Sequence, residues 1–161
     1  MRRLAPAVLL ALLACGPGNP GGPSMNNRIS SEQPGPDIQS NDILSRDAQA
    51  NHTQVKHILI GWRDLERSGG QIDARARTRT RQQADQLAQS LLERVRKGEP
   101  IEPLMSEFSE DGGSAEDGDS YEVTPDAKLV FEFKRLGLRL KLGEAGLVMS
   151  QFGWHIMKRV E

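Results

Sequence analysis

The sequence reads VKHILI at residues 55–60 and FGWHIM at residues 152–157. Each stretch is apolar and carries one histidine, His57 in the first and His155 in the second. Such runs predict β-strands, in which successive side chains point to opposite faces of a sheet. A histidine inside an apolar strand lies either at a pocket or in the core beside a polar partner. Because both stretches flank one helical region, we expect a single sheet that brings both histidines to a single site.

The region after the first strand, predicted over residues 53–62, is helical. Residues 73–97 have the strongest pattern, with apolar side chains recurring at the 3.6-residue period of one helix face. These side chains are Ala84, Leu87, Ala88, Leu91, Leu92 and Val95. Gly98 and Pro100 then end the helix, because both residue types are common just beyond a helix C-terminus. A shorter helix is predicted over residues 102–108.

An acidic, glycine-broken loop covers residues 109–120. Its carboxylates allow a calcium-site interpretation, with Asp111, Glu116, Asp117 and Asp119 as the ligands. The spacing argues against this, because Gly113 and Ala115 stand where ligand oxygens are required. We therefore expect no metal and no other cofactor. A calcium-binding protein is kept as an alternative that a calcium-dependent melting temperature would reveal.

Residues 125–143 carry two overlapping patterns. Leucines and one phenylalanine recur with helical spacing, yet leucines at every second position also alternate as in a strand. A helix over residues 125–136 and an extended exit to Gly143 accommodate both patterns, with the change at Gly137. Short strands are expected near residues 121–123 and 147–149, and a final strand over 153–160. Helices packed on a small sheet give an α+β domain.

The first residues form a targeting segment. Two arginines follow the initial methionine, and residues 4–14 are apolar. This run is shorter than the about 20 residues that a permanent membrane-spanning helix needs. The cysteine that follows it, Cys15, completes a stretch that resembles a bacterial lipobox, which predicts a lipoprotein signal peptide at residues 1–14 and a lipid on Cys15. An ordinary secretory signal with an incidental cysteine is the alternative.

Residues 15–50 are predicted to be a flexible, disordered linker, in which residues 42–50 allow a short helical turn. Proline and glycine are frequent here and apolar side chains are sparse, so the segment buries too little surface to offset the entropy lost on ordering. The net charge of −1 and the 4% aromatic content argue against nucleic acid as a partner. The single cysteine excludes an internal disulfide. No surface feature demands a second subunit, so we expect a monomer.

Taken in order, the motifs resemble a parvulin-type peptidyl-prolyl cis–trans isomerase, or rotamase, domain. The matching pieces are HILI at 57–60, the helix ending at Gly98, FSED at 108–111, Phe133 followed by Gly143 and Glu144, and FGWHI at 152–156. The resemblance covers residues 53–161, and we place the domain at 51–161. It implies a four-stranded antiparallel sheet wrapped by three to four helices, with both histidines in adjacent central strands.

The resemblance also implies the site residues. His57 and His155 would be the paired histidines beneath the site, Asp111 would face the substrate, and Ser150 would hydrogen-bond toward the histidines. Four residues would form the apolar surface for the proline ring: Leu129, Phe133, Phe152 and Tyr121.

Two departures from the family pattern border this proline pocket. Residues 117–121 read DGDSY where parvulins usually have a turn that contains a leucine, so the pocket leucine is absent or Tyr121 replaces it. Residues 143–148 are also one position shorter than usual. Both departures put turnover, more than the fold, in question.

The implied function is isomerisation of X-Pro bonds in proline-containing polypeptides outside the cytoplasm, assisting protein folding at the cell envelope. Gly16 after the cysteine favours the outer over the inner membrane. The alternative is a peptide-holding chaperone module of the same fold with negligible turnover. Arg63 and Arg67 stand where some parvulins bind phosphate, but Asp64 and Glu66 dilute the charge. We therefore do not expect phosphoserine-proline specificity.

Overall fold

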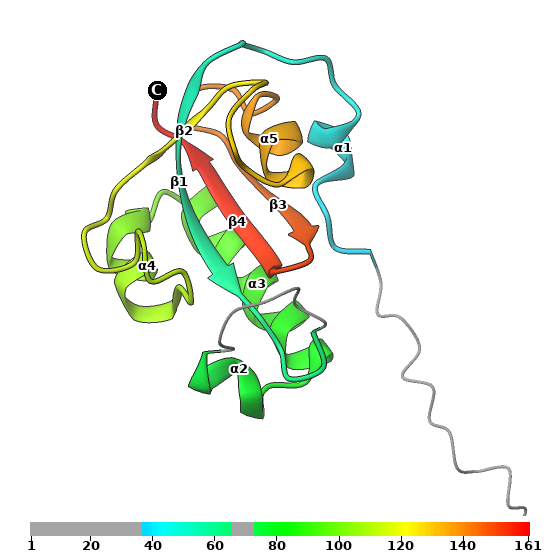
Figure 1. The fold of residues 1–161 in the computed structure, drawn as a ribbon, viewed down its shortest axis with the longest axis vertical. Coiled ribbons are helices and arrows are strands. Elements are labelled where there is room, and N and C mark those ends of the chain that lie inside the picture. The colour runs from blue at the N-terminus through cyan, green and yellow to red at the C-terminus, as the bar shows by residue number, and fades with distance from the viewer. Residues whose placement is uncertain (1–36, 66–72) are drawn as a thin grey trace, which may run out of the picture. The chain divides into compact units, whose positions relative to one another are not determined.

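The computed structural model describes residues 37–65 and 73–161, and their centre is a four-stranded antiparallel sheet with the strand order β2-β1-β4-β3. The strands are β1 (Thr53–Ile60), β2 (Tyr121–Val123), β3 (Ala145–Ser150) and β4 (Gly153–Arg159) (Figure 1). The two central strands, β1 and β4, carry the two histidines, which confirms the expected arrangement. The predicted signal peptide and Cys15 lie outside the described residues. Within the described ranges, no helix has the length and apolar character needed to cross a membrane.

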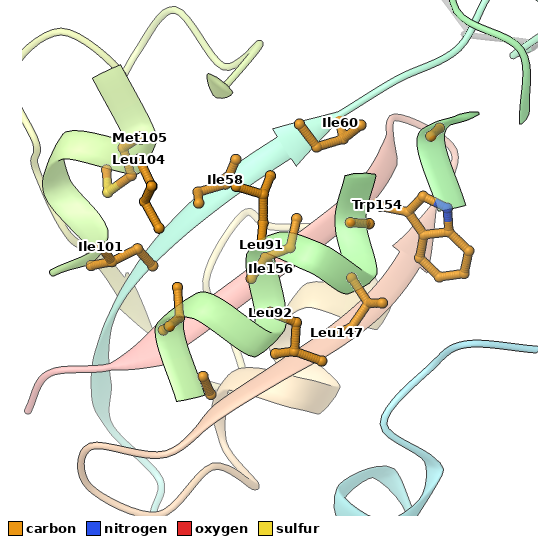
Figure 2. Close-up of a cluster of buried hydrophobic side chains, with 14 of the residues drawn as sticks. Ile58, Ile60, Leu91, Leu92, Ile101, Leu104, Met105, Leu147, Trp154 and Ile156 are labelled. Carbon is orange, nitrogen blue, oxygen red and sulfur yellow. The ribbon is translucent and has the colours of Figure 1, made fainter. Parts of the chain in front are cut away.

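Helices α3 (Arg81–Arg96) and α4 (Ile101–Phe108) pack against one face of the sheet. Because side chains alternate along a strand, every second residue of β1 and β4 points toward these helices. Figure 2 shows the resulting cluster, which includes Ile58, Ile60, Leu91, Leu92, Ile101, Leu104, Met105, Leu147, Trp154 and Ile156. Burial of each large aliphatic side chain contributes about 1.5–3 kcal/mol, so this layer is a main contributor to the stability of the sheet.

A second apolar cluster involves α5 (Phe131–Gly137) and α1 (Asn41–Leu44). Val55, Val148 and Met157 of the sheet contribute to this cluster. His57 and His155 are two residues away from Val55 and Met157 respectively, so they share this face of the sheet. The histidines therefore lie on the α5 side, away from the cluster in Figure 2.

The helix predicted over residues 73–97 is in fact two helices, α2 (Ala74–Thr78) and α3. Thr80 starts α3 with a capping box: its hydroxyl accepts from the Gln83 amide, and the Gln83 side chain accepts from the Thr80 amide. Arg79, just before this cap, has extended backbone. The apolar periodicity was read correctly from residue 84 onward, but the cap prevents one continuous helix.

The helix predicted over residues 125–136 is also shorter than expected. Residues 124–129 form a turn in which the amide of Ala127 donates to the carbonyl of Thr124 and the amide of Leu129 donates to that of Ala127. Val130 is extended and α5 begins only at Phe131. This turn places Leu129 and Val130 beside the histidines instead of on a helix.

The predicted linker ends too late, because residues 37–50, here called the N-terminal strap, are part of the fold. Its Ser40 lies along the outer edge of β3, where its amide donates to the Leu147 carbonyl and its hydroxyl accepts from the Leu147 amide, both at 2.9 Å. The Met149 amide donates to the side chain of Gln39 at 3.3 Å. The strap thus satisfies backbone groups that an edge strand otherwise leaves open.

The strap also contributes to the core and to an ion pair. Ile43 and Leu44 are 1% and 5% exposed and belong to the second cluster. Arg46 Nη1 donates to both carboxylate oxygens of Glu144, at 2.8 and 3.0 Å. A few apolar residues in a polar, proline-poor stretch gave too weak a pattern to distinguish this segment from the linker before it.

Candidate active site

The register of the two central strands brings the histidines together. His57 pairs with Met157 and His155 pairs with Leu59 across β1 and β4, so the histidines are diagonal neighbours on one face. Their rings stack at a centroid distance of 5.4 Å with 28° between the planes. Both are buried, at 3% and 4% exposure. The predicted meeting of two residues 98 positions apart is therefore what the sheet produces.

A continuous series of polar contacts runs through the two rings. The Ser150 hydroxyl lies 2.7 Å from His155 Nε2, the two Nδ1 atoms lie 3.4 Å apart, and His57 Nε2 lies 2.8 Å from Asp111 Oδ2. The ionised carboxylate accepts only, so His57 carries its proton on Nε2. His155 then donates from Nδ1 to His57 and accepts from the Ser150 hydroxyl. This assignment satisfies all three contacts.

Asp111 receives more hydrogen bonds than the one from His57. The Tyr121 hydroxyl donates to Oδ2 at 2.7 Å, the Ser114 hydroxyl to Oδ2 at 3.2 Å, and the Gly113 amide to Oδ1 at 3.2 Å. The His57 bond is the largest influence and holds the pKa of the carboxyl well below its usual range, while partial burial opposes this shift. The carboxylate therefore stays charged at the edge of the site.

Tyr121 is held in its neutral, donating form. Burial raises the pKa of its hydroxyl to about 12, and the hydrogen bond to the Asp111 carboxylate acts in the same direction. Tyr121 comes from β2 and contacts His57 edge-on at a centroid distance of 5.1 Å. It therefore serves the polar network with its hydroxyl and the apolar wall with its ring.

The residues before Asp111 fix its position by pairing with the end of β1. The Glu110 amide donates to the Leu59 carbonyl at 2.9 Å, and the Leu59 amide donates to the Ser109 hydroxyl at 3.1 Å. The Glu110 carboxylate accepts from the Gly61 amide at 2.8 Å and from the Arg79 guanidinium. The Glu110 side chain is fully buried and that of Arg79 is 14% exposed. This buried ion pair anchors the loop that presents Asp111.

An open cavity of about 490 Å³ lies over this network. It is lined by His57, Leu59, Asp111, Tyr121, Lys128, Leu129, Val130, Phe133, Phe152 and His155. Phe133 of α5 meets both histidines edge-on, at centroid distances of 5.0 and 5.4 Å. The cavity is therefore apolar on the α5 side and has a polar network at its base.

The structure brings all eight predicted site residues of the folded domain together. Seven of them line the cavity. The eighth, Ser150, lies behind His155 and also accepts from the Phe152 amide at 3.0 Å. Cys15, the predicted lipidation site, is outside the described residues.

Sequence reasoning missed three lining residues and one contact. Leu59 was available from the strand alternation, since it follows His57 by two positions on the same face. Lys128 and Val130 were missed because a helix was predicted over their positions, where the structure has a turn and an extended residue. The Tyr121 hydroxyl bond to Asp111 had no signal in the sequence, because it depends on how the loop 109–120 folds back on β2.

Within the described ranges, no cluster of three or more histidine, cysteine or acidic side chains is placed to hold a metal ion. Of the acids considered for calcium, Asp111 points its carboxylate at His57 and Tyr121 instead.

Comparison with known proteins agrees with the fold and the geometry. Residues 42–161 match the family model of the PPIC-type PPIase domain, and the chain belongs to this family. The parvulin-type peptidyl-prolyl isomerase domain predicted from the motifs is thereby confirmed.

Three relatives illustrate this membership. Chaperone SurA of Pseudomonas aeruginosa is 42% identical over 110 residues, covering 67% of this chain and 23% of SurA. Foldase protein PrsA of Bacillus subtilis is 31% identical over 75 residues, covering 46% of this chain and 26% of PrsA. The crystal structure of PrsA from Bacillus cereus superposes with a TM-score of 0.51 and 26% identity, covering 77% of this chain and 39% of that one. The chain thus spans about a quarter of the curated relatives' length.

Proposed function

We propose that this domain catalyses cis–trans isomerisation of X-Pro peptide bonds. One observation carries the proposal: an apolar cavity faced by Phe133 lies directly over a buried histidine pair and a hydrogen-bonded carboxylate. The uncatalysed reaction crosses a barrier of about 18–20 kcal/mol, because rotation breaks the amide resonance. No covalent bond is made or broken, so the domain needs neither a nucleophile nor a cofactor. It must only bind the twisted amide more tightly than the planar one.

In this proposal the apolar residues hold the proline ring. Leu129, Phe133, Phe152 and the ring of Tyr121 contact it and exclude water, which otherwise stabilises the polar planar amide. Asp111 sets the electrostatic field around the rotating carbonyl. The two histidines and Ser150 act mainly as a rigid base that keeps Asp111 and Phe133 in place, because every polar atom of the rings is engaged in the series of contacts described above.

We further infer that the clients are polypeptides outside the cytoplasm and that Cys15 carries a lipid anchor in the cell envelope, with the outer membrane favoured. The lipobox-like start supports this, and the relatives named chaperone and foldase support a role in protein folding. Metabolic labelling with a radioactive fatty acid tests the anchor: label should enter the wild-type chain and not Cys15→Ser. Equal labelling of both would contradict it.

The rival function is a peptide-holding module without turnover. The altered turn at residues 117–121 favours it, because the Tyr121 hydroxyl donates a hydrogen bond to Oδ2 of Asp111, the carboxylate that faces the cavity. A protease-coupled assay with the full chain and an Ala-Ala-Pro-Phe anilide separates the two functions. Isomerase activity should fall at least about tenfold in Phe133→Ala. Binding of the peptide without acceleration would leave only the holding module.

The matched control for Phe133→Ala is Phe131→Ala. Phe131 lies on the same helix, is 69% exposed and does not line the cavity. Its truncation should leave kcat/KM within about twofold. An equal loss in both variants would mean that α5 had been disturbed as a whole and that the proline pocket had not been tested specifically, which would count against the assignment of Phe133.

A further inference from the structure

One cationic side chain, that of Lys128, lies at the cavity and has no role in the proposed isomerisation. Lys128 lines the cavity and is exposed, and it is the only lysine or arginine in the lining. It sits in the 124–129 turn, one residue before Leu129, so its side chain starts next to the proposed surface for the proline ring. Among the described residues, no hydrogen bond or ion pair engages its ammonium group.

The neighbouring charges are accounted for by other contacts. Asp126 of the same turn accepts from the Thr124 hydroxyl at 2.8 Å. The Lys134 ammonium donates to the Pro125 carbonyl at 2.9 Å. The Asp111 carboxylate across the cavity is engaged by His57 and by its own loop. Lys128 is thus left to interact with whatever occupies the cavity.

We propose that Lys128 selects substrates with an aspartate or glutamate next to the proline. The inference rests on the proposed isomerase function and names its substrate preference. A polypeptide bound over Leu129 passes within reach of the ammonium group, which then pairs with a carboxylate in the substrate. Because the lysine is solvent-exposed, the preference is modest, roughly two- to fivefold in kcat/KM at low salt, and it weakens as salt screens the pair.

The test is NMR exchange spectroscopy on short peptides with the full chain as catalyst. The peptides carry Glu, Gln or Lys immediately before proline, and a second set carries Glu or Gln immediately after it. The wild-type chain should favour Glu over Gln in at least one set at 20 mM salt, and the ratio should approach one at 500 mM. Lys128→Gln should abolish the ratio, and Lys128→Glu should turn it into a preference for the Lys peptide.

Lys141→Gln is the matched control, since it removes the same charge from an exposed position outside the cavity lining. It should keep the wild-type ratio. A Glu-to-Gln ratio near one in both sets, or a ratio unchanged in Lys128→Gln, would overturn the inference while leaving the isomerase proposal intact. If no peptide is isomerised, the isomerase proposal fails separately, and dissociation constants of the same peptides decide the charge preference. Absence of any binding overturns both.

Discussion

At the scale of single residues, Asp111 connects the histidine pair to the cavity. It accepts hydrogen bonds from His57 of β1, from Tyr121 of β2 and from an amide of its own loop. Each such bond to a charged group contributes roughly 1.5–3 kcal/mol net. The carboxylate is therefore both part of the site and a contributor to the stability of the fold.

The stability that Asp111 provides should depend on pH. Folding lowers its pKa, so its contribution is fully present above the unfolded value of about 3.9 and is lost as the pH falls toward the folded-state pKa. Asp111→Asn should lower the free energy of unfolding by about 2 kcal/mol at pH 7, and the difference should shrink below pH 4. Urea unfolding across this range checks it.

Asp117→Asn, at an exposed position in the same loop, is the control and should follow the wild-type curve. A wild-type to Asp111→Asn difference that stays constant on acidification would contradict the role given to the ionised carboxylate.

The sequence predicted residue types at the site better than it predicted their contacts. His57 and His155 followed from strand alternation, and the motif order located Asp111. Tyr121 was one of two alternatives for the missing leucine, so the position of its ring in the apolar wall was considered and the hydrogen bond of its hydroxyl was not. Lys128 was not predicted as a site residue, because a surface lysine has no local sequence pattern. What such residues touch depends on the path of a loop, which short-range patterns do not encode.

At the scale of elements, the pairing of β1 with β4 depends on one glycine. Gly153 has a φ of 130°, and a Cβ there would lie 2.4 Å from the Ile60 carbonyl oxygen. Only glycine permits this approach at the start of the strand that carries His155.

Gly153→Ala should therefore destabilise the domain by about 2 kcal/mol or more, because both the backbone and the Ile60 carbonyl must shift. Thermal unfolding measures the loss. Gly112→Ala offers a comparison, since a Cβ there meets nothing within 4 Å, and it should unfold close to wild type. Similar losses in the two variants would rule out the close approach as the cause.

The buried Arg79–Glu110 pair is a second element-scale feature. Arg79→Ala removes the guanidinium from a fully buried carboxylate and should cost about 3–5 kcal/mol. Denaturant unfolding checks this against Glu93→Gln, which breaks the exposed Lys97–Glu93 pair at 3.6 Å and should cost under about 1 kcal/mol. A loss below 1 kcal/mol in Arg79→Ala would show that water replaces the guanidinium easily.

Element types were predictable, and element ends were less so. The periodicity around Leu91 and the stop at Gly98 defined α3 well at its C-terminus. Its start was missed because a capping box at Thr80 outweighs the helical propensity of the residues before it. The start of α5 was missed because leucines with helical spacing also fit a turn followed by an extended residue.

At the scale of the whole molecule, the N-terminal strap changes where the domain begins. A chain that starts at residue 51 lacks Ile43 and Leu44, two buried side chains worth about 1.5–3 kcal/mol each. It should be less stable than a chain that starts at residue 37 by roughly 3 kcal/mol or more. Urea unfolding of both chains checks this, and equal midpoints would show that the strap adds nothing.

The domain as a whole was predictable because its motifs lie in a fixed order, and the strap was not because it has no motif of its own. Ser40 acts through its backbone and hydroxyl on β3. Serine and glutamine are common in linkers as well, so their presence in the sequence does not indicate that they cover a strand edge.

The central place of β4 has a consequence for biosynthesis. β4 is the last strand of the domain to leave the ribosome, yet it hydrogen-bonds to both β1 and β3. Until it emerges, β1 has only the three-residue β2 as a partner, and contacts between such distant positions form slowly. Because β4 also carries His155, the histidine pair and the cavity above it form only after the last strand has emerged.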